Sequence, residues 1–208
     1  MSDNHEFSNA VFLDAVTEIL NIGIGSAGSV LSEMVNDDVK LTVPGVMFIS
    51  QPDALQILEQ NTQQAVSGVS QHFSGMMTGD VLLLFPEANC LKLVRTILQQ
   101  DISLDDLTEM EQEAMTEIGN VILNSCLCSI ADRFKQQITS GIPEFLKSSL
   151  SNILFNANLI NKVEACVLLL NVEFSIATNQ IDGYVSVVMD IESMAFFKQN
   201  IEQYYLQI

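Results

Sequence analysis

The sequence predicts an α/β protein in which one unit occurs twice, with one mixed β-sheet and two long helices that carry the functional residues. Two observations lead to this prediction. The order long helix, interrupted strand, β-hairpin and helix is indicated twice along the 208 residues. A polar pattern on the two long helices also repeats, at a constant offset of 99 positions (117 − 18 and 120 − 21). We expect a single domain built from two repeats, roughly residues 8–100 and 103–206.

The first half opens with a helix predicted over residues 9–34, where the N-cap candidate Asn9 precedes apolar residues at helical spacing. Residues 39–50 alternate partly and contain β-branched residues, which predicts a strand interrupted at Pro44. The rest of this half is predicted as a helical turn near residues 54–59, a hairpin of strands 65–74 and 79–85, and a helix from Pro86 to about Gln99.

The second half restarts with caps and first-turn acids at residues 103–106, followed by a long helix that ends near Arg133. Residues 145–159 look partly helical where the first half has a strand, so the repeat is expected to loosen there. The remainder is predicted as a hairpin of strands 163–176 and 184–190, with its turn near residues 179–183, and a closing helix over residues 192–205.

The charge balance is strongly acidic, with 8 Lys and Arg against 26 Asp and Glu and a formal net charge of −18. Such a chain repels phosphate backbones and anionic lipid surfaces, so nucleic acid and membrane partners are not expected. No run reaches the roughly 18 to 20 apolar residues that span a bilayer. The polar, acidic N-terminus does not resemble a signal peptide, and we expect a cytoplasmic protein.

Residues Gly23–Gly28 match the pattern G-x-G-x-x-G letter for letter, which raises a dinucleotide-binding interpretation. That motif needs a strand before it and an acidic residue about twenty positions later. Here a predicted helix precedes it, and no acid lies near residues 47–49. We expect these small residues to let the helix lie close against a neighbouring element instead.

Most other signatures of catalytic sites are missing. There is no nucleophile elbow, no P-loop and no H-E-x-x-H, and His5 and His72 offer no plausible triad. The four cysteines lie in apolar stretches without a framework spacing, so we expect buried, reduced thiols and no zinc site. Any chemistry must therefore come from carboxylates and amides.

The repeated polar pattern is an acidic residue, a Glu four positions later, an Asn three positions further and a Pro after 22 more residues. The first motif is Asp14, Glu18, Asn21 and Pro44, and the second motif is Glu113, Glu117, Asn120 and Pro143. The spacings of four and three place the acid, the Glu and the Asn on one outward stripe of each helix. The plain alternative is that these are ordinary solvated residues of a helix face, and this alternative is strongest for Asp14 and Glu113.

An Asn carboxamide cannot abstract a proton at neutral pH, but it can orient a water molecule. Phosphoryl transfer is a reaction in which orientation goes far, because its transition state needs charge neutralisation and an in-line water more than a strong base. A Glu beside the Asn would repel a phosphate, but it can hold a lysine of a partner. The stripe is thus suited to entering another protein's site, where that partner supplies the phosphoryl group and the cation.

The doubled pattern resembles the CheC/CheX/FliY family of phosphatases, which act on the phosphorylated chemotaxis response regulator CheY. The resemblance covers essentially the whole chain, and its length and duplication look most like the CheC members. It implies a pseudo-symmetric α/β fold with two active sites, Glu18 with Asn21 and Glu117 with Asn120. One position departs from the family pattern, because Glu113 stands where Ser or Asp is expected, and we rank the second site slightly below the first.

By the family mechanism, each Asn positions water for in-line attack on the receiver's aspartyl phosphate, and each Glu pairs with the receiver's active-site lysine. The resemblance implies no cofactor of the chain's own, because the receiver supplies Mg²⁺. It also implies a second partner, the receptor deamidase CheD. Pro44 and Pro143 are expected to be structural, because they end or bend the segment after each helix.

Two other functions stay open from the sequence. One is a non-catalytic adaptor that binds a receiver domain or CheD. The other is a component of the flagellar switch in the manner of FliY, which is weakened because the sequence stops at Ile208 without a further domain.

Overall fold

The order of elements repeats in full. The computed structural model describes residues 10–62, 66–98, 108–156, 165–176 and 179–203. Its first half consists of α1 (Ala10–Val35), β1 (Val39–Thr42), β2 (Val46–Ser50), α2 (Gln51–Asn61), β3 (Val66–Gly75), β4 (Gly79–Pro86) and α3 (Glu87–Leu98). Its second half consists of α4 (Glu109–Phe134), β5 (Ile138–Ser140), β6 (Glu144–Ser148), α5 (Leu150–Asn156), β7 (Ala165–Ile176), β8 (Asn179–Asp190) and α6 (Ile191–Ile201).

The eight strands form one sheet in the order β1-β7-β8-β4-β3-β5, with β2 also on β7 and β6 also on β3. The halves interlock, because β1 and β2 pair with the hairpin of the second half, and β5 and β6 with that of the first. The α/β class is confirmed, but the sheet is not mixed, since every pairing between described strands is antiparallel. The strands are antiparallel within each hairpin, β3–β4 and β7–β8, and the equivalent strands β4 and β8 pair antiparallel where the two halves meet.

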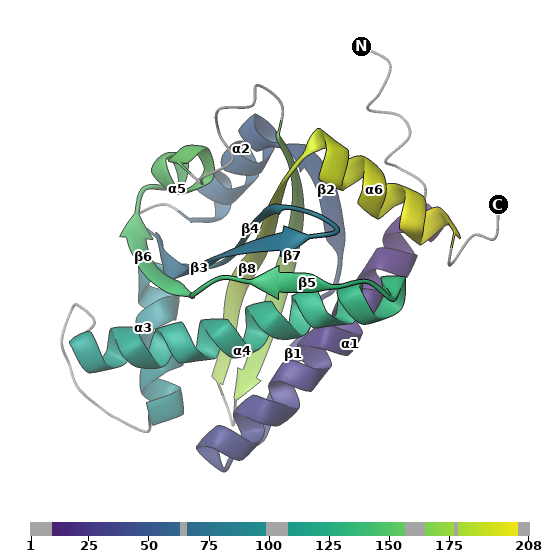
Figure 1. The fold of residues 1–208 in the computed structure, drawn as a ribbon. Coiled ribbons are helices and arrows are strands. Elements are labelled where there is room, and N and C mark those ends of the chain that lie inside the picture. Colours follow the sequence, from purple (N-terminus) through teal and green to yellow (C-terminus); the bar gives the residue numbers. More distant parts are fainter. Residues whose placement is uncertain (1–9, 63–65, 99–107, 157–164, 177–178, 204–208) are drawn as a thin grey trace.

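Helices cover both faces of the sheet (Figure 1). The long helices α1 and α4 pack against each other and share the larger core with α3 and α6. The short helices α2 and α5 pack together over the opposite face. Strand β4 shows the division, because Val81, Leu83 and Phe85 face the larger core while Leu82 and Leu84 face the smaller one. Burying each such side chain stabilises the fold by about 1.5–3 kcal/mol.

Two predictions about the second half need correction. Residues 145–159 are partly helical as predicted, because α5 lies there, but the expected loosening of the repeat is wrong, since β6 and α5 follow as β2 and α2 do in the first half. Strand β6 exists because it pairs with β3 of the other half, a contact that local sequence does not encode. The predicted turn at residues 179–183 belongs to β8, which pairs with β7 along its whole length. Parts of the predicted termini of the second half, at residues 103–106 and 204–205, lie outside the described residues.

Helix α4 begins with a capping box. The Thr108 hydroxyl accepts from the Glu111 backbone N–H, and the Glu111 carboxylate accepts from the Thr108 N–H at 2.7 Å. Arg95 of α3 donates to the same carboxylate at 2.9 Å, and the Glu111 side chain is buried. The backbone hydrogen bond from Thr108, followed by the one from Arg95, lowers the pKa of Glu111 below its ordinary value. This carboxylate therefore ties α3 to the start of α4.

The predicted close packing of the first helix against a neighbour is confirmed, and the neighbour is α4. A Cβ on Gly23 of α1 would lie 2.5 Å from the carbonyl oxygen of Ser125 and 2.7 Å from the hydroxyl of Ser129.

By length and composition alone, both α1 and α4 could cross a bilayer. In the structure many of their apolar residues, such as Ile19 and Ile122, are buried in the core between the two helices and the sheet, while others, such as Ile22, are exposed. Packing in the fold thus accounts for part of their apolar character.

We expect Gly23→Ala to destabilise the fold by about 1–3 kcal/mol, because the added methyl group would meet the Ser125 backbone. Gly25 offers a matched control two positions away, since a Cβ there meets nothing within 4 Å. Gly25→Ala should stabilise the protein by about 0.5–1 kcal/mol through helix propensity. Urea denaturation measures both changes. Shifts of the two midpoints in the same direction would contradict the close packing of α1 on α4.

Candidate functional site

The two motifs lie at equivalent places on α1 and α4. In the first motif, Asp14 and Glu18 are exposed and Asn21 is half-buried. The second motif has the same pattern, because Glu113 and Glu117 are exposed and Asn120 is half-buried. The stripes therefore face outward as the spacing predicts, with each Asn at the boundary between solvent and core. The helices also end alike, because Asn36 and Lys135, again 99 positions apart, are both left-handed with φ of 52° and 51°.

The Asn of the first motif makes two hydrogen bonds to the backbone. Asn21 Nδ2 donates to the carbonyl of Val43 at 3.0 Å, and the Val43 N–H donates to Asn21 Oδ1 at 2.9 Å. Val43 is only 3% exposed, so the Asn21 side chain supplies hydrogen bonds to its backbone where little solvent can reach. Pro44 follows directly and is exposed. The carboxamide thus fastens the end of β1 to α1.

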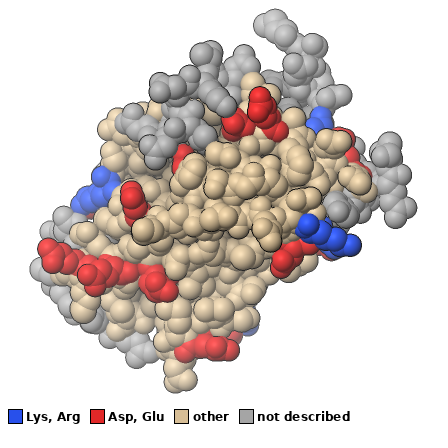
Figure 2. All heavy atoms as spheres, in the orientation of Figure 1, with Lys and Arg blue, Asp and Glu red and all other residues tan. Residues whose placement is uncertain are grey.

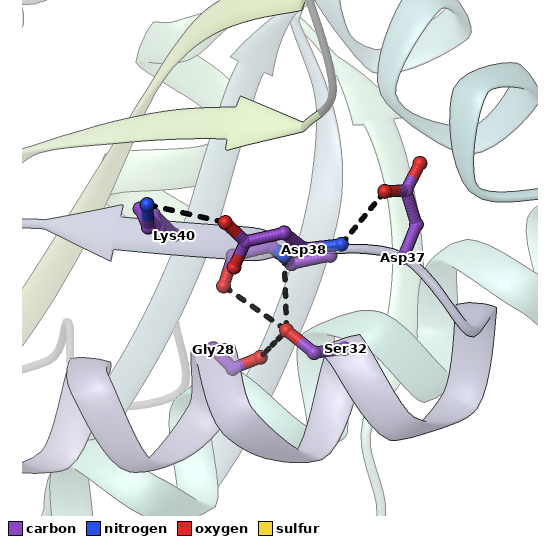
Figure 3. A network of polar contacts seen from close by, with 6 residues as sticks. Gly28, Ser32, Asp37, Asp38 and Lys40 are labelled. Carbon is purple, nitrogen blue, oxygen red and sulfur yellow. Dashed lines mark hydrogen bonds and ion pairs between the residues drawn. The ribbon is translucent and has the colours of Figure 1, made fainter.

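A second fastening lies at the other end of β1 (Figure 3). The Ser32 hydroxyl accepts from the Val39 N–H at 2.9 Å and lies 2.8 Å from the carbonyl of Gly28 and 3.2 Å from that of Val39. Lys40 and Asp38 form an exposed ion pair beside it at 3.1 Å. Strand β1 is therefore held along α1 at both ends, by Ser32 and by Asn21.

The second motif lacks both sets of hydrogen bonds that hold β1 to α1. Asn120 Oδ1 accepts from Asn124 Nδ2 at 2.6 Å, within α4 itself. The position that corresponds to Ser32 is Ala131 (131 − 32 is 99), which has no hydroxyl. Gly141 is held on β3 instead, where its N–H donates to the carbonyl of His72 at 2.7 Å. The next residue, Ile142, is 84% exposed, whereas its counterpart Val43 is buried.

The charges around the two motifs differ. Figure 2 shows a row of acidic side chains over the N-terminal half of α4, where Glu109 precedes the acids of the second motif at four-residue spacing, and a basic group near the C-terminal end of α4. Beside the first motif lies a hollow of about 420 Å³, lined by Ile22, Ser129, Asp132, Arg133 and Lys135. The second motif thus lies in an acidic field, and basic groups adjoin the first.

The cysteine prediction holds for two residues of four. Cys90 and Cys126 are buried, and burial raises the pKa of each thiol to about 12. Cys128 is exposed and Cys166 is half-buried, so the prediction is wrong for these two. Cys128 follows the buried Cys126 by two positions, which places it on another side of α4. Within the described ranges, no three His, Cys, Asp or Glu residues gather closely enough to hold a metal ion.

The structure adds residues that the sequence did not single out. Asn124 determines the partner of Asn120, and Ser32 helps to fasten β1. Their counterparts, Gly25 and Ala131, lack these polar groups, so a comparison of the two repeats at the offset of 99 would have found both differences.

The two arrangements differ in what they can do chemically. A carboxamide has two N–H donors and one carbonyl acceptor, and it can orient a water only with groups that are not already engaged. Asn21 uses both its nitrogen and its oxygen on Val43. Asn120 accepts one bond, and among the described residues its Nδ2 makes no hydrogen bond. Among the described residues, the Asn120 carboxamide therefore keeps two N–H hydrogens without an acceptor, and the Asn21 carboxamide keeps one.

Comparison with known proteins supports the predicted resemblance. The model of the CheC-like family matches residues 12–48, which contain the first motif. The CheY-P phosphatase CheC of Bacillus subtilis is 25% identical over 135 residues, or 64% of this chain. That match spans 64% of the relative's length, slightly less than two thirds.

Solved structures share the fold. Thermotoga maritima FliY has a TM-score of 0.72 at 18% identity, covering 96% of this chain and 98% of that one. FliM in the FliG–FliM complex from H. pylori has a TM-score of 0.64 at 11% identity, covering 89% and 96%. The resemblance to CheC-like proteins and the α/β fold expected from it are confirmed.

Proposed function

We propose that this protein is a phosphatase that removes the aspartyl phosphate of a CheY-like response regulator in chemotaxis signalling. The observation that carries the proposal is the pair of outward Glu-x-x-Asn stripes at equivalent places on α1 and α4 of a CheC-like fold. The name of the Bacillus subtilis relative supports the same substrate class. We place the protein in the cytoplasm, where such a regulator works.

The chemistry is an in-line hydrolysis in the receiver's own pocket. Asn120 enters the pocket and orients a water whose oxygen forms the new bond to phosphorus. The bond between phosphorus and the aspartate oxygen breaks and leaves a carboxylate, while the proton of the water goes to the released phosphate or to solvent. The receiver holds the Mg²⁺ that neutralises the phosphoryl oxygens. No general base is required of this chain.

Glu117 has a binding role in this proposal. Its exposed carboxylate pairs with the lysine of the receiver's active site, a charge-assisted contact that directs Asn120 toward the phosphate. Glu18 offers the same contact at the first motif, with Asp14 and Glu113 one turn earlier on their helices. Pro44 and Pro143 shape the segments that follow each helix and do not touch the receiver.

A specific observation favours an adaptor role for the first motif. Asn21 is held against the backbone by its two bonds to Val43, with one Nδ2 hydrogen left over, while Glu18 beside it remains exposed. The first motif would then bind a receiver without hydrolysing its phosphate. A fold shared with FliM is compatible with binding alone. CheD is a further partner that we propose from the family resemblance, without a surface assigned to it.

Receiver-phosphate decay and receiver binding, measured together, separate enzyme from adaptor. The probe is CheY of Bacillus subtilis, phosphorylated with acetyl phosphate, and its decay is followed with the unmodified chain and with the double variant Asn21→Ala, Asn120→Ala. We expect the unmodified chain to accelerate decay, and the double variant to bind the receiver without accelerating it. A double variant that is folded and equally fast would refute the role of the carboxamides. An unmodified chain that binds without accelerating decay would establish the adaptor.

A further inference from the structure

We infer that Asn124 is a positioning residue that sets the orientation of the Asn120 carboxamide, an inference that rests on the proposed phosphatase function. The two residues lie one helical turn apart on α4, and Asn124 Nδ2 donates to Asn120 Oδ1 at 2.6 Å. Both side chains are half-buried, so the bond forms at the edge of the core. The bond is made within α4, so the carboxamide is oriented before any partner arrives.

The first motif provides an internal comparison. The position that corresponds to Asn124 is Gly25 (124 − 25 is 99), which has no side chain to offer. Open space surrounds it, since a Cβ there would meet nothing within 4 Å. Without a partner on its own helix, Asn21 bonds the backbone of Val43 with both its nitrogen and its oxygen. The same motif residue thus takes a different partner according to the residue four positions after it.

The segment before Pro143 is held elsewhere. Gln71 of β3 donates Nε2 to the carbonyl of Gly141 at 2.9 Å, and the Gly141 N–H bonds the carbonyl of His72. Ile142, the counterpart of Val43, is then largely exposed. Two separate features therefore free Asn120 from the fastening role of Asn21: β3 holds Gly141, and Asn124 occupies the Asn120 oxygen.

The consequence for catalysis is preorganisation. With Oδ1 accepting from Asn124, the Asn120 carboxamide is held on α4 and keeps a lone pair on Oδ1. Among the described residues, no acceptor takes the two Nδ2 hydrogens. They remain available to a water or to a phosphoryl oxygen in the receiver's pocket. A polar group held in place beforehand does not have to be ordered during the reaction.

The test uses Asn124→Asp, which keeps the shape of the side chain and removes its N–H donor. With phosphorylated CheY of Bacillus subtilis as the probe, we expect kcat to fall about tenfold, the equivalent of one side-chain hydrogen bond, and KM to stay within about twofold. Asn124→Ala should give a similar loss. In an Asn120→Ala background, Asn124→Asp should have no further effect, because the positioned group is gone.

Gly25→Asn is the matched control in the first motif, and it should leave kcat within about twofold because the backbone already holds both Asn21 groups. An unchanged kcat in Asn124→Asp, or a change confined to KM, would overturn the inference. So would an equal effect of Asn124→Asp in the presence and absence of Asn120.

A second readout does not depend on activity. The side-chain amide signals of Asn120 in a ¹⁵N-labelled NMR spectrum, assigned through their loss in Asn120→Ala, should shift in Asn124→Asp and stay in place in Gly25→Asn. Signals that do not move in Asn124→Asp would contradict the positioning role. If the unmodified chain has no phosphatase activity, the proposed function fails, and this spectrum alone decides whether Asn124 orients Asn120.

Discussion

Asn120→Ala is expected to lower the phosphatase rate about a hundredfold, the scale of effect seen when a group that orients a reactant is lost. Asn21→Ala is expected to leave the rate within about twofold. We base the difference on the hydrogen bonds, since Asn120 keeps both Nδ2 hydrogens available while the Asn21 carboxamide is held to the Val43 backbone through its nitrogen and its oxygen. Decay of receiver phosphate at saturating receiver, measured for each single variant, gives both numbers.

The free energy of unfolding should fall more in Asn21→Ala than in Asn120→Ala, the opposite of the order expected for activity. Asn21→Ala leaves the N–H and the carbonyl of a buried Val43 without their side-chain partner, at a cost of about 1–3 kcal/mol in the free energy of unfolding. Asn120→Ala removes one bond between two half-buried side chains and should cost less than about 1 kcal/mol. Equal losses of activity in the two single variants, with equal stabilities, would contradict the division between a fastened motif and a free one.

Arg95→Leu is expected to destabilise the fold by about 3 kcal/mol, because it leaves the buried Glu111 carboxylate without its cation. For a chain of this length, that loss corresponds to a fall in Tm of roughly 6–12 °C. The Arg95 side chain is mostly buried itself, so little solvent screening weakens the pair. Calorimetry or thermal circular dichroism measures the change.

Lys147→Ala is the matched control, because Lys147 and Glu87 form an ion pair at 2.6 Å in which both side chains keep substantial exposure. It should cost less than about 1 kcal/mol. If the two substitutions cost the same, Glu111 is not the buried anchor of α4 that the capping box and the Arg95 contact indicate.

Low pH should weaken the contribution of the Glu111 carboxylate to the stability of the fold. The pKa of Glu111 is lowered in the folded state by the Thr108 backbone and by Arg95, so the folded protein binds fewer protons there than the unfolded chain. Its contribution to stability is complete above the ordinary pKa of 4.5 and is lost as the pH falls through the lowered value. The difference in stability between the unmodified protein and Arg95→Leu should therefore narrow below about pH 4.5. A difference that stays constant into stronger acid would argue against an ionised Glu111.

Much of the architecture could be predicted because its signals are local. The long helices follow from apolar residues at helical spacing, and each hairpin from short apolar strands around a turn. The small residues 23–28 predicted close packing against a neighbour, and the structure places Gly23 against Ser125 of α4. The outward stripes of both motifs follow from the spacing of Glu18, Asn21 and their counterparts.

The wrong predictions concern contacts between the halves. Strand β6 was missed because its residues also suit a helix, and only β3 of the other half makes them a strand. The three-residue β5 likewise depends on β3. The prediction of a mixed sheet was wrong because the relative direction of the strands from the two halves is set by the antiparallel pairing of β4 with β8.

The inequality of the two motifs could not be predicted from the motifs themselves. Sequence ranks the first above the second because Glu113 departs from the family pattern. The structure adds a difference that lies outside the motif, the contrast between Gly25 and Asn124, and the ranking stays a prediction. The Gly25 and Asn124 residues matter because of their surroundings: β1 runs beside α1, which brings Val43 within hydrogen-bond distance of Asn21.

Multiple turnover tests the central claim most directly. A small amount of the unmodified chain is mixed with a large excess of phosphorylated receiver, and the release of inorganic phosphate is followed over time. A phosphatase releases many equivalents of phosphate for each molecule of this chain, and with Asn120→Ala the release falls close to the receiver's own rate of decay. Release at the receiver's own rate with the unmodified chain, despite measurable binding, would contradict the claim.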